Sequence, residues 1–452
     1  MQIIIVGCGK VGIALTEQLS REEHNITIID NNYDTVKVVS GTYDVMGIAG
    51  NGASYKTLMD ADIEHTDMLI AVTESDELNL LCCVIAKKAS NCHTIARVRN
   101  PIYSAERKFI KQELGLSMII NPEFAAAREI ARLLRFPSAI EIDSFSKGRI
   151  EILRFRVPQG SKLSGFALKD ISGRMQCDIL VCVAQHGNQI LIPDGNYVVQ
   201  EGDLLSIIAT PGNASDFFRK IGIHTNQVHN TMIVGGGDIT YYLTMLLQNM
   251  GVRVKILEKD RRRCEELSEL LPKAIIIHGD GSDQELLNEE HLEQMESFVA
   301  CTDMDEENII LSLYAKDKVK CKVVTKINHL DFNDVIHALE LDSLVYPKHI
   351  TAEIILQYVR AMENSVGSNV ETLYKLVDDR VEALEFVIRK ESPITGVKLQ
   401  DLRFKKNILL ACINHNGKIL IPGGQDSIAV GDSVIVVTTH SGLQDIHDIL
   451  EK

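Results

Sequence analysis

The chain has 452 residues, of which 45% are hydrophobic and 24% are charged, a balance typical of soluble globular proteins with about two to four domains. Its formal net charge of -15 argues against a nucleic-acid partner, because duplex binding needs a basic face, and against direct adsorption to anionic lipid. There is no signal-peptide pattern, and no apolar run approaches the roughly 18 residues that span a bilayer, so we expect a cytoplasmic chain without membrane insertion.

The first 125 positions alternate strand-like apolar runs with helix-like patterns. The expected strands are Ile3–Val6, Ile26–Ile29, Met68–Thr73 and Thr94–Val98, and the expected helices are Val11–Ser20 and Glu77–Lys88. A strand–helix–strand rhythm of this kind predicts a doubly wound parallel sheet, so we assign residues 1–125 to a Rossmann-like α/β domain.

A glycine-rich motif joins the first strand to the first helix, and it reads Gly7-Cys8-Gly9-Lys10-Val11-Gly12. In this GxGxxG fingerprint the first glycine permits the turn, the second lets phosphates approach the backbone, and the third lets helix and sheet pack. The helix N-terminus offers N–H groups to a pyrophosphate. Asp30 closes the second strand and would accept hydrogen bonds from both ribose hydroxyls, which favours NAD-type or adenine nucleotides over NADP. The alternative is a glycine turn without a ligand.

Polar residues follow the later strands at the edge where ligands bind in such sheets. Asn51 lies in a glycine-flanked turn after the third strand, and Thr73 and Glu74 end the fourth. Arg97 and Arg99 are two apart, so on a strand they face one side, where a guanidinium would reach a phosphate. The alternative for the two arginines is a surface ion pair.

A smaller module follows at 137–222, and we expect a compact α+β domain there because short β-like runs alternate with turns. Its expected strands are Ile150–Val157, Ile179–Ala184 and Leu204–Ala209. Domain boundaries are expected within 122–137, 222–230 and 347–369.

The arrangement then recurs, because Gly50–Ala53 returns as Gly279–Ser282 (279 − 50 = 229) and Ile190–Pro193 returns as Ile419–Pro422 at the same offset. We therefore expect a second Rossmann-like domain at 229–350 and a second small α+β domain at 369–452. Their expected strands are Met232–Val234, Val254–Leu257, Phe298–Thr302, Ala383–Ile388, Ile408–Ile413 and Val434–Thr438.

The second fingerprint is altered, and it reads Gly235-Gly236-Gly237-Asp238-Ile239-Thr240. Thr240 places a Cβ where the third glycine would be, and Asp238 adds a negative charge near the phosphate. Under the fixed offset, Arg97 and Arg99 become Lys326 and Asn328, so one basic group is kept. A purely structural copy is the alternative to a second site. The candidate ligand-binding residues of this copy are Gly235, Gly237, Glu258, Asp280 and Thr302.

The ten cysteines show no CxxC pairing and the histidines are scattered, so we predict no metal site and no catalytic residues.

The motifs together resemble the RCK (also called KTN) domain family, whose pattern is GxGxxG, an acid closing the second strand, G-[DN]-G, and V/C-T-[DE]-x-D-E-x-N. An I-L-I-P…G-D segment follows each copy, as in RCK-C modules. The order N–C–N–C resembles the cytosolic regulatory subunits of bacterial Trk potassium uptake systems.

The resemblance implies that the chain binds NAD(H) and ATP or ADP and assembles into a ring, which we expect to be a homotetramer. It also implies a membrane-embedded potassium channel or transporter subunit (TrkH/TrkG-like) as partner, met at the cytoplasmic face of the inner membrane. Such a chain is not an enzyme: ligands would shift the population between ring shapes and so gate the partner. Two rival hypotheses are an NAD-dependent oxidoreductase, which needs an acid–base group facing the nicotinamide, and a passive scaffold without ligands.

Overall fold

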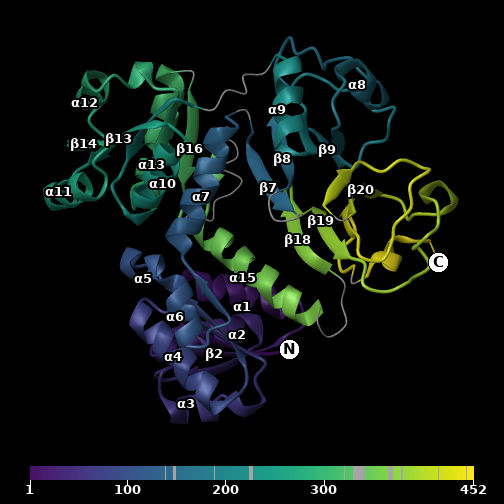
Figure 1. Ribbon diagram of the computed structural model, residues 1–452. Helices are drawn as coiled ribbons and strands as arrows, with labels where there is room; N and C mark the ends of the chain where they lie inside the picture. Colours follow the sequence, from purple (N-terminus) through teal and green to yellow (C-terminus); the bar gives the residue numbers. More distant parts are fainter. Residues whose placement is uncertain are drawn as a thin grey trace. The chain divides into compact units, whose positions relative to one another are not determined.

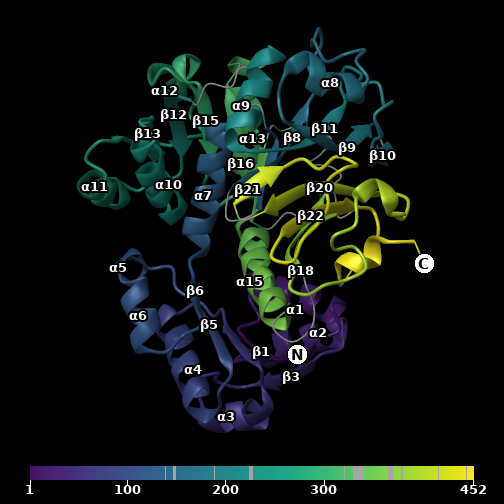
Figure 2. The same ribbon diagram turned by 45° about the vertical axis from the view of Figure 1, so that its right-hand side comes forward.

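The computed structural model describes residues 1–137, 139–145, 149–187, 189–222, 228–319, 321–328, 339, 341, 343–364, 370–377, 380–415, 417–443 and 445–451. The chain divides into two compact units (Figures 1 and 2). The first unit is Met1–Ala131 with His229–Leu356, and the second is Arg132–Val228 with Gln357–Lys452. Each unit therefore combines one segment from each copy of the repeat.

The first segment of the first unit forms a six-stranded parallel sheet with the order β3-β2-β1-β4-β5-β6. The order reverses between β1 and β4, the place where ligands bind in doubly wound sheets. Its strands are β1 (Gln2–Val6), β2 (Asn25–Asp30), β3 (Met46–Ala49), β4 (Met68–Ala71), β5 (His93–Arg97) and β6 (Met118–Ile120). Its helices are α1 (Lys10–Arg21), α2 (Tyr33–Tyr43), α3 (Tyr55–Asp60), α4 (Asp76–Ala89), α5 (Pro101–Ala105) and α6 (Arg107–Glu113), with a 3-10 turn η1 (Ile63–His65).

The centre of this sheet is apolar on both faces, which suits a parallel sheet covered by helices on both sides. Ile3, Ile4 and Ile5 of β1 are at most 1% exposed. In α1, Leu15 and Leu19 recur four positions apart, so they share one helix face, and both are fully buried. This packing holds the start of α1 against the end of β1.

The second segment repeats the sheet, with the order β14-β13-β12-β15-β16-β17. The doubly wound parallel fold expected for both copies is therefore confirmed. The strands are β12 (Asn230–Val234), β13 (Arg253–Glu258), β14 (Ile275–His278), β15 (Ser297–Ala300), β16 (Lys322–Lys326) and β17 (Ser343–Val345). The helices are α10 (Asp238–Asn249), α11 (Arg261–Leu270), α12 (Gln284–Glu289) and α13 (Asp305–Lys318), with a 3-10 turn η3 (Leu292–Gln294).

Two of the segments expected to hold domain boundaries are long helices, α7 (Pro122–Arg135) and α15 (Pro347–Asn364). Proline opens each helix, where its missing N–H and fixed φ are well tolerated. Each helix starts in the first unit and ends in the second. Among the described residues, none of the helices is both long and apolar enough to cross a membrane.

The second unit holds two antiparallel five-stranded sheets, ordered β10-β9-β11-β8-β7 and β18-β19-β22-β20-β21. Ile152, Cys182 and Ile208 of the first sheet share one hydrophobic core with Ala383, Ala411 and Val437 of the second. Figure 2 shows β9 beside β20.

The elements of the first module are β7 (Glu141–Phe145), β8 (Ile150–Arg156), α8 (Leu168–Met175), β9 (Leu180–His186), β10 (Gln189–Leu191), β11 (Leu204–Ala209) and α9 (Pro211–Lys220). Those of the second are β18 (Val370–Leu376), β19 (Val381–Val387), η4 (Leu399–Asp401), β20 (Ile408–His415), β21 (Lys418–Leu420), β22 (Ser433–Thr438) and η5 (Ile446–Ile449).

The aspartate of the repeated Gly-Asp segment has the same structural role in both small modules. Asp203 is fully buried, and one of its oxygens lies 2.7 Å from Nδ1 of His186. In the second module, Asp432 lies 2.5 Å from Nδ1 of His415. The other oxygen of each aspartate accepts a backbone N–H from the preceding turn. The repeated aspartate therefore ties a turn to a neighbouring strand.

Candidate functional site

The turn between β1 and α1 requires glycine at two positions. Gly7 has a φ of +102°, and a Cβ on it would lie 2.9 Å from the backbone nitrogen of Thr73. A Cβ on Gly12 would lie only 1.9 Å from the carbonyl oxygen of Gly7. These glycines let the first turn of α1 approach both its own loop and the end of β4.

Packing within the protein does not require glycine at position 9, because a Cβ there would meet no protein atom within 4 Å. Gly9 is also the N-cap of α1, and no side chain caps this helix, whereas Asn32, Ser54 and Ser75 cap α2, α3 and α4. An open backbone at an uncapped helix N-terminus is suited to a phosphate group. Lys10 and Val11 form the first turn of this helix.

Asp30 lies at the end of β2 and faces the glycine loop. One carboxylate oxygen accepts the backbone N–H of Cys8 at 2.7 Å, and the other accepts that of Asn32 at 2.9 Å. The Cys8 side chain is 5% exposed, and burial, assisted by the charge of Asp30, raises the pKa of its thiol to about 12. Cys8 therefore offers its backbone to the loop and has no activated thiolate.

Arg97 and Arg99 donate to consecutive carbonyl groups just beyond β4. Arg97 Nη2 lies 2.6 Å from the oxygen of Thr73, and Arg99 Nη2 lies 2.6 Å from that of Glu74. The structure thus brings both arginines to one edge, bonded to the main chain. Arg97 Nε is buried without a hydrogen-bond partner, and burial lowers the pKa of its guanidinium.

The side chain of Asn79 joins the ends of two neighbouring strands at this edge, and this residue is not among those predicted from the sequence. Its Oδ1 accepts the backbone N–H and the hydroxyl of Thr73, at 2.8 and 2.7 Å, and its Nδ2 donates to the carbonyl of Arg97 at 2.9 Å. Asn308 makes the same set of bonds with Thr302 and Lys326. The signal was present in the sequence, because this asparagine closes the repeated T-[DE]-x-D-E-x-N motif.

Asn51 and Asp280 occupy matching exposed turns after β3 and β14. Asn51 Oδ1 accepts the N–H of Ala53, and Asp280 Oδ1 accepts the N–H of Ser282, both at 2.9 Å. The backbone hydrogen bond from Ser282 is the main cause that lowers the pKa of Asp280. Both side chains thus close their own turns.

The second glycine loop keeps the geometry of the first. Gly235 has a φ of +99°, a Cβ on Gly237 would meet no protein atom within 4 Å, and no side chain caps α10. Glu258 accepts the backbone N–H of Gly236 at 2.5 Å. Thr240, expected to crowd the loop, is fully buried, and its hydroxyl donates to the carbonyl of Gly235 at 2.6 Å. A hydrogen bond thus takes the place of the close backbone approach that Gly12 permits.

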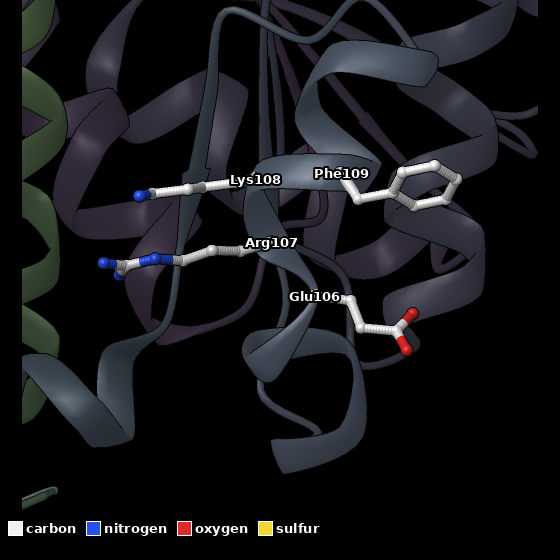
Figure 3. A pocket seen from close by; sticks show the side chains of 4 residues that line it. All are labelled: Glu106, Arg107, Lys108 and Phe109. Carbon is white, nitrogen blue, oxygen red and sulfur yellow. The ribbon is translucent and has the colours of Figure 1, made fainter.

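A separate hollow lies where α5 meets α6, lined by Glu106, Arg107, Lys108 and Phe109 (Figure 3). Arg107 and Lys108 point to one side, and Glu106 and Phe109 point to the other. None of the glycine-loop residues lines this hollow. It is therefore distinct from the candidate nucleotide site.

A parallel sheet of this order, with a glycine loop, an uncapped helix and an acid closing the second strand, is the arrangement of a Rossmann-type nucleotide-binding domain. The family model of the TrkA-N domain matches residues 3–122 and 231–347, and that of the TrkA-C domain matches residues 152–222 and 383–451. The chain belongs to the TrkA family of Trk system potassium uptake proteins. The resemblance stated from the sequence is therefore confirmed.

Relatives and solved structures agree with this assignment. The chain is 31% identical to the Trk system potassium uptake protein TrkA homolog of Archaeoglobus fulgidus, over 99% of this chain and 100% of that protein. It is 30% identical to TrkA of Haemophilus influenzae, over 96% of this chain and 95% of that protein. The fold is similar to the RCK domain of GsuK, with a TM-score of 0.63 and 16% identity over 96% of this chain and 92% of that one.

Proposed function

We propose that the chain is a nucleotide-sensing regulatory subunit that gates a membrane-embedded potassium channel or transporter subunit. The observation that carries this proposal is the open backbone at Gly9, under an uncapped helix and beside Asp30, in a chain of the TrkA family. The proposed ligands are NAD(H), ATP and ADP. GsuK channel structures bound to NAD and to ADP support this choice of ligand class.

In this proposal, the pyrophosphate lies on the backbone of the Gly7–Gly12 loop, and the ribose hydroxyls bind Asp30. When the ligand binds, Arg97 and Arg99 release these main-chain carbonyls and donate to the ligand phosphates instead. The new hydrogen bonds are charge-assisted. The ligand-binding residues proposed for the first copy are Gly7, Cys8, Gly9, Lys10, Val11, Gly12, Asp30, Asn51, Thr73, Glu74, Arg97 and Arg99. Those proposed for the second copy are Gly235, Gly237, Glu258, Asp280 and Thr302.

Ligands that bind two shapes of the assembly unequally shift the population between them. We propose a homotetrameric ring that transmits this shift to a TrkH/TrkG-like subunit at the cytoplasmic face of the membrane. Moving such an equilibrium from mostly closed to mostly open takes about 5 kcal/mol of differential binding, which several sites in one ring supply together.

The oxidoreductase alternative is less favourable because of the side chains at the strand ends. A dehydrogenase needs a group that exchanges a proton beside the nicotinamide. Here the hydroxyl of Thr73 is committed to Asn79, and the neighbouring cations are Arg97 and Arg99. Arginine stays protonated, so it binds anions rather than exchanging protons.

The proposal is tested by calorimetric titration of the full chain with NADH, NAD, ATP and ADP, alongside Asp30→Ala and Glu258→Ala. Loss of one binding site in Asp30→Ala, together with loss of nucleotide-dependent potassium flux in vesicles that carry the partner, is the expected result. Absence of binding by the wild-type chain would overturn it, as would turnover of NADH with a panel of small carbonyl compounds.

A further inference from the structure

The two glycine loops differ in charge at one position, the first residue of the helix that follows. Lys10 opens α1, whereas Asp238 opens α10. A carboxylate at this position lies next to the backbone N–H groups that hold a phosphate in such folds, and it would repel the ligand. The second loop therefore needs a compensating charge if it is to bind a nucleotide.

Arg263 supplies that charge. Its Nη2 lies 2.9 Å from Asp238 Oδ1, its Nε lies 2.7 Å from the carbonyl oxygen of Gly236, and its Nη1 lies 3.0 Å from Glu266 Oε2. The side chain is 26% exposed, so the charge acts in a partly desolvated place. One guanidinium thus holds both the acidic residue and the backbone of the second glycine loop.

The first copy has neither member of this pair. Asn32 and Asp260 cap the two matching helices α2 and α11, and the residue three positions after the cap is Thr35 in one and Arg263 in the other. The pair Lys10 and Thr35 therefore carries one positive charge, and the pair Asp238 and Arg263 carries none. Glu266, the third partner of Arg263, has a side chain that is 60% exposed, so solvent screens its charge. The two changes in the second copy compensate each other.

We infer that Arg263 determines nucleotide binding at the second site, because it cancels the charge of Asp238 and so allows a phosphate to approach the loop. The inference rests on the proposed nucleotide-sensing function and extends it to a residue outside the fingerprint. The ligand class is an adenine nucleotide with a pyrophosphate group. Arg263 is therefore a positioning residue of that site.

The test uses the full chain with Asp30→Ala, so that the second site is read alone, and titrates it with NADH and with ADP. Arg263→Gln should raise Kd about tenfold, the effect expected of one uncompensated charge near a phosphate in a partly hydrated site. Adding Asp238→Asn to Arg263→Gln should restore Kd to within about threefold, because the repulsion is then gone. Salt near 0.5 M should shrink the defect of Arg263→Gln, because it screens the repulsion.

Arg262→Gln is the matched control, because it removes the same charge one position earlier from an exposed side chain. It should leave Kd within about twofold of the parent chain. The inference is overturned if Arg263→Gln binds as the control does, or if Asp238→Asn fails to restore binding while both variants unfold at the parent temperature. If the Asp30→Ala chain binds nothing while the wild-type chain binds one nucleotide, this inference fails and the proposed function stands.

Discussion

The phenol of Tyr242, in the second Rossmann copy, donates a hydrogen bond of 3.1 Å to the main-chain carbonyl of Arg99 in the first. Tyr242 is 7% exposed, and its ring packs edge-on against Phe124 of α7. Asn121 donates to both the Tyr242 hydroxyl and the Arg99 carbonyl, at 3.0 and 3.1 Å. The arginine proposed to bind phosphate in one copy is therefore held by a side chain of the other.

We expect Tyr242→Phe to weaken nucleotide binding at the first site about two- to fivefold, because the net value of one hydrogen bond is about 1 kcal/mol. Calorimetry in a Glu258→Ala background isolates that site. Tyr241→Phe is the control, since Tyr241 is the neighbouring tyrosine of the same helix and the bond to the Arg99 carbonyl comes from Tyr242. Equal affinities for the two variants would show that the contact does not support the site.

The glycine at position 12 and the threonine at position 240 should respond in different ways to substitution. Gly12→Ala places a methyl group 1.9 Å from the Gly7 carbonyl oxygen, so we expect a loss of about 3 kcal/mol or more in unfolding free energy. Thr240→Val keeps the shape but removes the donor to Gly235, and we expect a loss of about 1–2 kcal/mol. Urea unfolding measures both, and a neutral Gly12→Ala would contradict the close approach.

The buried aspartates of the small modules should be needed for stability. Asp203 is bonded to Tyr197, Gln200 and His186, so Asp203→Ala leaves several polar groups without a partner. We expect a loss of about 2–4 kcal/mol, measured by thermal unfolding, with nucleotide affinity unchanged. Asp194→Ala, at an exposed turn, should change stability by less than about 1 kcal/mol. A similar loss in both variants would argue against a special role for the buried acid.

The thiol of Cys8 should react only at high pH or after unfolding. Burial raises its pKa from 9.0 to about 12, so alkylation at pH 8 should be about a thousandfold slower than for a free thiol. Because the neutral thiol is favoured in the fold, the stability it contributes is complete below pH 9 and is lost as pH rises toward 12. Mass spectrometry of the Cys8 peptide, with and without urea, measures this. Fast labelling in the folded chain would contradict the burial.

Local patterns in the sequence predict much of this fold. The alternating apolar runs mark the strands of both parallel sheets, and the fingerprint predicts the strand-to-helix turn with its positive φ at Gly7. The fixed offset predicts the second copy before its weaker motif is considered. These features are visible because each depends on residues close together in the chain.

The remaining features depend on contacts between distant residues. The sequence predicts a domain boundary within 122–137 but does not show that a helix, α7, covers most of that range. From the sequence alone, Thr240 is expected to disturb the glycine loop, whereas in the structure its hydroxyl donates a hydrogen bond to the carbonyl of Gly235. Arg263 lies 25 positions from Asp238, so nothing local connects them.

Each compact unit is made from both copies of the repeat, so neither copy alone contains a complete unit. A chain of half this length would have to pair with a second copy of itself to bury the shared core of the small modules. Covalent fusion removes the requirement that the two partners be identical. The two halves can then carry different residues at matching positions, and the difference between Lys10 and Asp238 is one that a symmetric dimer of identical chains does not permit.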